Sequence, residues 1–182
     1  MIAFISGGAR SGKSTYAELL ARRWQGERGG KRYYLATASV DIQDSEMQAR
    51  IARHRRERGA GWSTLEVPVA LDRALEDVTA DSTVLLDCLT LWTSQVLYAS
   101  ELDEAAALGV LTGALATARA RRLALVIVSN DLNEGMPPEN DEVWRYLAFL
   151  QRVHCLVAHE ADEVVQVVAG LPQVWKTRGD TP

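Results

Sequence analysis

Residues 2–14 read Ile2-Ala3-Phe4-Ile5-Ser6-Gly7-Gly8-Ala9-Arg10-Ser11-Gly12-Lys13-Ser14, an apolar run followed by a glycine-rich loop. The loop fits the phosphate-binding pattern G-x-x-x-x-G-K-[ST], and it stands between a strand-like segment and a helical one, as that motif requires. Glycines let successive backbone N–H groups face phosphate oxygens, and the positive end of the next helix adds to that field. Lys13 can reach the β- and γ-phosphates, while the Ser14 hydroxyl can hold Mg²⁺. We therefore predict a nucleoside triphosphate site, against the alternative of a glycine-rich turn that binds nothing. Its predicted residues are Gly7, Gly8, Ala9, Arg10, Ser11, Gly12, Lys13 and Ser14.

Length and composition favour an ordinary globular protein. The 182 residues are 47% hydrophobic and 24% charged, so we expect residues 1–182 to form a single nucleotide-binding domain. A net charge of −4 argues against a general nucleic-acid-binding protein. Cys88 and Cys155 lie far apart without metal-ligand spacing, and we expect both to be small buried residues in a reducing cytoplasm. We expect no signal peptide and no membrane span, because no apolar run is long enough to cross a bilayer.

Apolar runs alternate with helical patterns along the chain. Strands are predicted over residues 2–6, 33–38, 64–67, 83–87, 123–129 and 163–168. Helices are predicted over residues 15–24, 46–58, 69–78, 89–98, 104–122 and 141–161. This alternation predicts an α/β fold like that of the P-loop NTPases, with a doubly wound, mainly parallel sheet. After a turn at residues 170–172, residues 174–176 are expected to add a short antiparallel C-terminal strand.

Several candidate site residues stand at or just after the ends of predicted strands. Thr37, Ala38, Asp87 and Asn130 stand at the carboxyl ends of three of them, where open α/β sheets bind their ligands. Asp87 closes an apolar strand, and a carboxylate there can hold Mg²⁺ directly or through water. The alternative is that Asp87 caps the helix that begins at Leu89.

The basic segment 46–58 contains His54 on the same helical face as Met47 and Ile51. It is either a solvated helix, a nucleic-acid-binding helix or a polyphosphate-binding helix. In the third case the surrounding arginines keep the His54 imidazole neutral near pH 7, so that it can act as a nucleophile. The residues alone leave these readings open. His154 and His159 do not share a helical face as a metal pair would, and we expect both to be structural.

The motifs together resemble the bifunctional adenosylcobinamide kinase / adenosylcobinamide-phosphate guanylyltransferase family of cobalamin biosynthesis. Besides the phosphate loop, the resemblance includes residues 34–38, 44–47, Arg50, Ile51, His54, 62–66, 85–90, 128–130, 138–140 and 161–164. Such a family member would phosphorylate the aminopropanol hydroxyl of adenosylcobinamide with a nucleoside triphosphate, ATP or GTP. A histidine would then take GMP from GTP, release pyrophosphate and pass the GMP to adenosylcobinamide phosphate, which yields adenosylcobinamide-GDP.

The resemblance also implies residue roles and an assembly. His54 matches the guanylyl-accepting histidine. Nucleotide contacts beyond the loop map onto Ala36, Thr37, Ala38, Arg55, Arg56, Arg58, Glu66 and Asp87. A homotrimer and two small-molecule substrates, the nucleotide and the corrinoid, are implied as well. The chain departs from the family pattern at residues 131–137 and at His154, which stands where the family has an asparagine.

Two further functions fit the phosphate loop. A monofunctional small-molecule kinase would use Lys13 and leave His54 inert. A GTP-binding regulatory protein without turnover would normally carry an Asn-Lys-x-Asp motif to read guanine, and this sequence has none. Covalent labelling by GTP separates the bifunctional enzyme from both.

Overall fold

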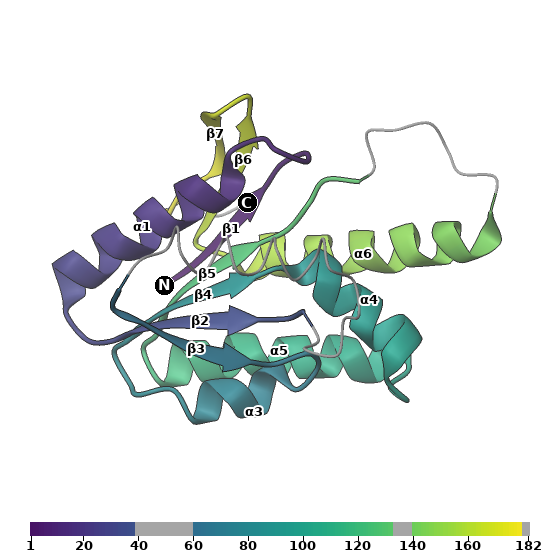
Figure 1. The fold of residues 1–182 in the computed structure, drawn as a ribbon, viewed down its shortest axis with the longest axis horizontal. Helices are drawn as coiled ribbons and strands as arrows, with labels where there is room; N and C mark the ends of the chain where they lie inside the picture. The colour runs from purple at the N-terminus through teal and green to yellow at the C-terminus, as the bar shows by residue number, and fades with distance from the viewer. Residues whose placement is uncertain (39–59, 133–139, 180–182) are drawn as a thin grey trace.

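A computed structural model describes residues 1–38, 60–132 and 140–179 (Figure 1). Its strands are β1 (Ile2–Ser6), β2 (Arg32–Ala36), β3 (Trp62–Glu66), β4 (Thr83–Asp87), β5 (Ala124–Val128), β6 (Glu163–Val168) and β7 (Leu171–Lys176). Its helices are α1 (Lys13–Arg28), α3 (Leu71–Glu76), α4 (Leu89–Ala99), α5 (Glu104–Ala120) and α6 (Asp141–Glu160). The predicted helix over 46–58 lies outside the described residues.

The seven strands form one sheet in the order β3-β2-β4-β5-β1-β6-β7. All neighbouring pairs are parallel except β6 and β7, which pair antiparallel. The predicted doubly wound sheet with its short antiparallel C-terminal strand is thus confirmed. Because β1 and β4 are separated only by β5, the loops that follow β1 and β4 lie near each other at the carboxyl edge.

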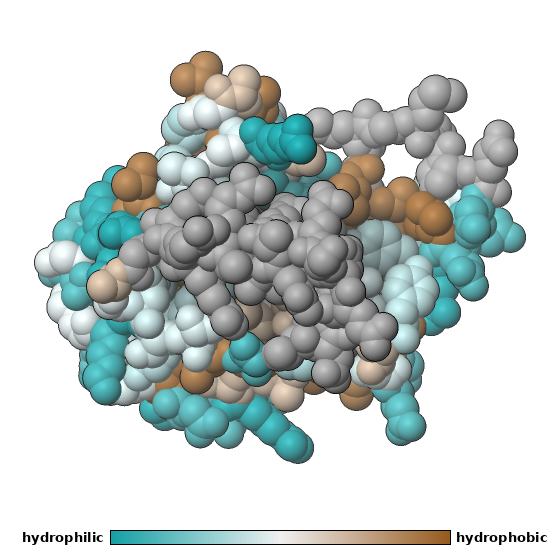
Figure 2. Space-filling model, in the orientation of Figure 1, coloured by the Kyte–Doolittle hydropathy of each residue, from teal (hydrophilic) through white to brown (hydrophobic). Residues whose placement is uncertain are grey.

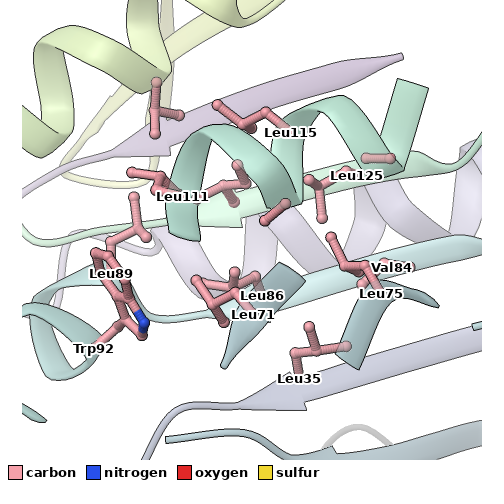
Figure 3. Close-up of a cluster of buried hydrophobic side chains, with 14 of the residues drawn as sticks. Leu35, Leu71, Leu75, Val84, Leu86, Leu89, Trp92, Leu111, Leu115 and Leu125 are labelled. Atoms are coloured by element: carbon pink, nitrogen blue, oxygen red, sulfur yellow. The ribbon is translucent and has the colours of Figure 1, made fainter. Parts of the chain in front are cut away.

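Helices cover both faces of the sheet, with α1 on one face and α3, α5 and α6 on the other (Figure 1). The central strands are buried on both faces because their side chains alternate between two apolar clusters. On β4, for example, Val84 and Leu86 join the cluster that contains Trp92 and Leu111, whereas Leu85 packs on the α1 side. Figure 3 shows the first cluster between the sheet and helices α3, α4 and α5. Such a rigid centre fixes the positions of the strand ends that carry the polar residues.

Several element boundaries differ from the sequence predictions, among them both ends of α1 and the start of β7. Helix α1 begins at Lys13 and continues through Gly26 to end at the C-cap Gly29. The sequence predicts that this helix ends at residue 24, but an exposed glycine such as Gly26 costs a helix only about 1 kcal/mol relative to alanine, and α1 continues past it. Strand β7 already includes Leu171 and Pro172, so the turn is tighter than predicted. No helix within the described ranges combines the length and hydropathy that a membrane span needs.

Candidate functional site

The glycine-rich loop connects β1 to the first turn of α1. Arg10 and Gly12 have positive φ angles of 59° and 93°, which turn the backbone on itself. The Lys13 ammonium donates to the Gly8 carbonyl at 3.0 Å, so its charge is held at the loop. Gly12 occupies the N-cap position of α1 without a side-chain cap, which leaves the first N–H groups of the helix for a ligand. The loop therefore has the conformation and the charge to hold a polyphosphate.

The turn between β6 and β7 supports this loop from one side. The Gly170 N–H donates to the Ser11 carbonyl at 2.8 Å. A Cβ atom on Gly7 would lie 2.5 Å from the Val167 carbonyl oxygen, and one on Gly12 would lie 3.3 Å from the Gly170 Cα. Glycine is required at Gly7 and Gly12 partly because the hairpin backbone approaches so closely.

The predicted nucleotide residues at the other strand ends form one row. In the sheet register Ala36 lies beside Glu66 on one side and Asp87 on the other. Helix α1 packs against β5 and β4, and the charge of Lys13 at its start acts on Cys88, the residue that follows β4. Parallel pairing thus gathers side chains from distant points of the chain at one edge, as the sequence predicted.

Hydrogen bonds from β2 and from the residue that follows it fix Asp87 and Cys88 in position. The Tyr34 hydroxyl donates to Asp87 Oδ2 at 3.0 Å. The fully buried Thr37 hydroxyl accepts from the Cys88 N–H at 2.9 Å and donates to the Cys88 carbonyl at 2.8 Å. Cys88, and not Asp87, occupies the N-cap position of α4, so the alternative that Asp87 caps this helix is wrong.

The donor set at this edge fits Mg²⁺. Ser14 and Asp87 offer a hydroxyl and a carboxylate oxygen, the hard ligands that this ion prefers. Within the described ranges, no group of three or more His, Cys, Asp or Glu residues could hold a metal ion. A site with two protein oxygens suits Mg²⁺, because this ion takes most of its ligands from water and from nucleotide phosphates.

Charges at the site influence the neighbouring thiol. Burial, followed by the adjacent Asp87 carboxylate, raises the pKa of the Cys88 thiol to about 11, and the Lys13 ammonium acts in the opposite direction. Cys88 is therefore a buried and unreactive thiol next to Asp87. Both cysteines are free, but the expectation of burial fails for Cys155, which is exposed on α6.

A second polar group lies at the ends of β1, β5 and β6. The Asp131 carboxylate accepts from Ser6 Oγ at 3.3 Å and from Gln166 Nε2 at 3.0 Å, and the Asp131 N–H donates to the Gly7 carbonyl at 3.0 Å. These bonds tie the start of the phosphate loop to the strand ends beside it.

His154 on α6 makes a separate contact with the end of β5. Its Nε2 lies 2.7 Å from Ser129 Oγ, which in turn lies 3.1 Å from Thr90 Oγ1. Burial lowers the pKa of His154, although Asp131 opposes this effect. His159 is exposed and lies beside Glu160. Asp131 and His154, which both differ from the family pattern, thus interact electrostatically.

Four of the predicted site residues belong to the basic segment 46–58. His54, Arg55, Arg56 and Arg58 lie outside the described residues. Sequence reasoning missed the bond from Tyr34 to Asp87. The available signal was weak: Tyr34 shares a strand face with Ala36, but nothing in the sequence states which strand lies beside β2.

Comparison with known proteins assigns nearly the whole chain to one family. The sequence model described as "Cobinamide kinase / cobinamide phosphate guanyltransferase" matches residues 3–174. The bifunctional adenosylcobalamin biosynthesis protein CobP of Pseudomonas aeruginosa is 39% identical over 177 residues, which covers 94% of this chain and 95% of that protein. The bifunctional adenosylcobalamin biosynthesis protein CobU of Salmonella typhimurium is 33% identical, with 94% and 97% covered.

Solved structures with a similar fold are more distant in sequence. The flagellar accessory protein FlaH from Methanocaldococcus jannaschii superposes with a TM-score of 0.53 at 12% identity, covering 97% of this chain and 78% of that one. A KaiC-like protein from Pyrococcus horikoshii gives a TM-score of 0.53 at 10% identity, covering 98% and 79%. At this identity the likeness concerns the fold alone.

Proposed function

The chain belongs to the cobinamide kinase / cobinamide phosphate guanyltransferase family, and on that premise we propose that it carries out both reactions on adenosylcobinamide. It first phosphorylates the aminopropanol hydroxyl, and it then transfers GMP from GTP to that phosphate to give adenosylcobinamide-GDP. The observation that carries the proposal is the phosphate loop with Lys13, set at the same sheet edge as Asp87, in a chain that the family matches from residue 3 to 174. We treat residues 1–182 as one nucleotide-binding domain.

The first reaction uses the phosphate loop. The substrate hydroxyl oxygen attacks the γ-phosphorus of ATP or GTP and gives up its proton to solvent water, while the bond to the β-phosphate oxygen breaks and the nucleoside diphosphate leaves. Loop N–H groups and Lys13 stabilise the charge that develops on the phosphate oxygens. Ser14 and Asp87 would hold Mg²⁺, which when bound neutralises phosphate charge.

The second reaction requires a nucleophile, and we assign it to His54. An imidazole nitrogen attacks the α-phosphorus of GTP and expels pyrophosphate, which leaves GMP on the histidine. A phosphate oxygen of adenosylcobinamide phosphate then attacks the same phosphorus and frees His54. The assignment rests on the place of His54 in the basic segment and on the family resemblance. Arg55, Arg56 and Arg58 are proposed to neutralise the triphosphate, and Ala36, Thr37, Ala38 and Glu66 to contact the nucleotide.

We also propose that the protein works in the cytoplasm, since its nucleotide substrates are supplied there. We further propose that it forms a homotrimer. The exposed apolar residues of the β6–β7 hairpin support a subunit contact: Val168, Leu171, Val174 and Trp175 are all at least half exposed. Figure 2 shows this apolar surface at the top of the molecule. Sedimentation equilibrium should give three times the 20.0 kDa mass of one chain, and a monomer mass would reject the trimer.

The product test is direct. Purified protein is incubated with adenosylcobinamide, ATP, GTP and Mg²⁺, and the corrinoids are separated and identified by mass spectrometry. We expect the phosphate first and the GDP derivative second. Lys13→Ala should lower kcat/KM for the kinase step by about a hundredfold or more, because a preorganised positive group at the transferred phosphate is lost. Lys31→Ala is the control, as Lys31 is exposed at the opposite edge of the sheet, before β2. Accumulation of the phosphate alone would instead identify a monofunctional kinase.

A further inference from the structure

Two adjacent tyrosines on β2 point to opposite faces of the sheet. Tyr34 packs in the cluster on the α1 side, and its hydroxyl donates to Asp87 Oδ2 at 3.0 Å. Tyr33 packs in the opposite cluster, and its hydroxyl lies 2.9 Å from Thr79 Oγ1. Both rings are buried, with exposed fractions of 7% and 8%. The two residues match in type, strand and burial, but only Tyr34 touches the candidate metal carboxylate.

The Tyr34 ring is held in place by its neighbours. It meets the Trp62 ring edge to face, with the two centroids 6.4 Å apart. The Arg32 guanidinium carbon in turn lies 5.2 Å from the Trp62 centroid. A ring fixed in this way gives its hydroxyl a fixed position at the end of β4.

Without a partner, an aspartate carboxylate rotates broadly about its last torsion. The bond from Tyr34 engages one carboxylate oxygen and orients the other, while Thr37 fixes the backbone of the next residue through both of its bonds to Cys88. Tyr34 of β2 therefore positions the side chain of Asp87, and Thr37, which follows β2, positions the main chain of the next residue.

We propose that Tyr34 is a positioning residue for the Mg²⁺ site: its hydroxyl holds Asp87 so that the second carboxylate oxygen faces the ion or a water bound to it. The proposal rests on the proposed function, which gives Asp87 its role towards Mg²⁺. Partners that orient metal ligands typically change metal affinity by 10- to 100-fold when they are removed.

The test measures nucleotide binding and requires no turnover. A fluorescent GTP analogue is titrated into wild type, Tyr34→Phe and Tyr33→Phe, once in EDTA and once over a series of Mg²⁺ concentrations. For Tyr34→Phe we expect the affinity for the GTP analogue in EDTA to equal that of wild type. The Mg²⁺ concentration that gives half of the Mg²⁺-dependent gain in affinity should rise about tenfold. Tyr33→Phe should match wild type in both conditions. Thermal unfolding of all three proteins checks that each is folded.

A double-mutant cycle with Asp87→Asn gives a second measure. If Tyr34 acts through Asp87, then adding Tyr34→Phe to Asp87→Asn causes no further loss of the Mg²⁺ effect. Three results overturn the proposal: an unchanged Mg²⁺ requirement in Tyr34→Phe, an equal loss of affinity in EDTA and in Mg²⁺, or additive losses in the cycle. Failure of the proposed function looks different, because wild type itself would then bind the analogue poorly or show no Mg²⁺ effect.

Discussion

Individual residues were predictable where a motif fixes both their type and their spacing. Lys13 and Ser14 follow from the loop pattern, and Asp87 from its place after an apolar strand. The contacts of Tyr34 and Thr37 with residues 87 and 88 were not predictable, because they depend on β2 lying beside β4, which no local pattern specifies. At this scale the sequence identifies the residues that carry the chemistry but misses those that hold them in place.

His154 makes the stability of the protein depend on pH, and substitution of this histidine tests its contribution. Burial lowers its pKa from the usual 6.5, so between that value and the lower folded value the unfolded chain binds more protons than the native one. The free energy of unfolding should therefore fall as the pH drops below about 6.5, and the loss should be complete below the folded pKa. His154→Gln should lose this part of the dependence in urea unfolding between pH 8 and pH 5. His159→Gln, an exposed position on the same helix, is the control and should follow wild type. Parallel curves for wild type and His154→Gln would contradict the assignment.

Elements were predicted best where both ends carry clear signals. The bounds of β1, β4 and β6 match the sequence predictions because an apolar run stops at a polar residue or a glycine. Helix α1 was predicted too short at both ends, since its N-terminus lies inside the phosphate loop and Gly26 does not stop it. What no pattern revealed is that the β6–β7 turn supports that loop, a contact between segments far apart in the chain.

The contact between the β6–β7 hairpin and the phosphate loop predicts that alanine substitutions at two neighbouring glycines change the stability differently. Gly7→Ala would place a Cβ 2.5 Å from the Val167 carbonyl oxygen, whereas a Cβ on Gly8 meets no atom within 4 Å. We expect Gly7→Ala to lower the free energy of unfolding by about 2 kcal/mol, because the hairpin backbone must move. Gly8→Ala should stay within about 0.5 kcal/mol of wild type. Urea unfolding of both variants measures this, and equal effects at Gly7 and Gly8 would show that the hairpin does not constrain the loop.

The whole molecule is a sheet whose strand order brings distant residues to one edge. Alternating strands and helices predicted the fold class and the edge that carries the site, because ligands of such sheets bind at the carboxyl ends of the strands. The order β3-β2-β4-β5-β1-β6-β7 did not follow from the sequence, since many orders satisfy the same alternation. The order matters for function, because it places the end of β2 beside Asp87, the end of β3 on the other side of β2, and the hairpin beside the phosphate loop.

The claim that one chain performs both reactions depends on a covalent GMP–histidine. Wild type and His54→Ala are incubated with Mg²⁺ and GTP labelled at the α-phosphate, denatured, separated on a gel and treated with acid. The account predicts an acid-labile label on wild type that is absent from His54→Ala, while His54→Ala still phosphorylates adenosylcobinamide. Wild type without label, or His54→Ala labelled as strongly as wild type, would contradict it.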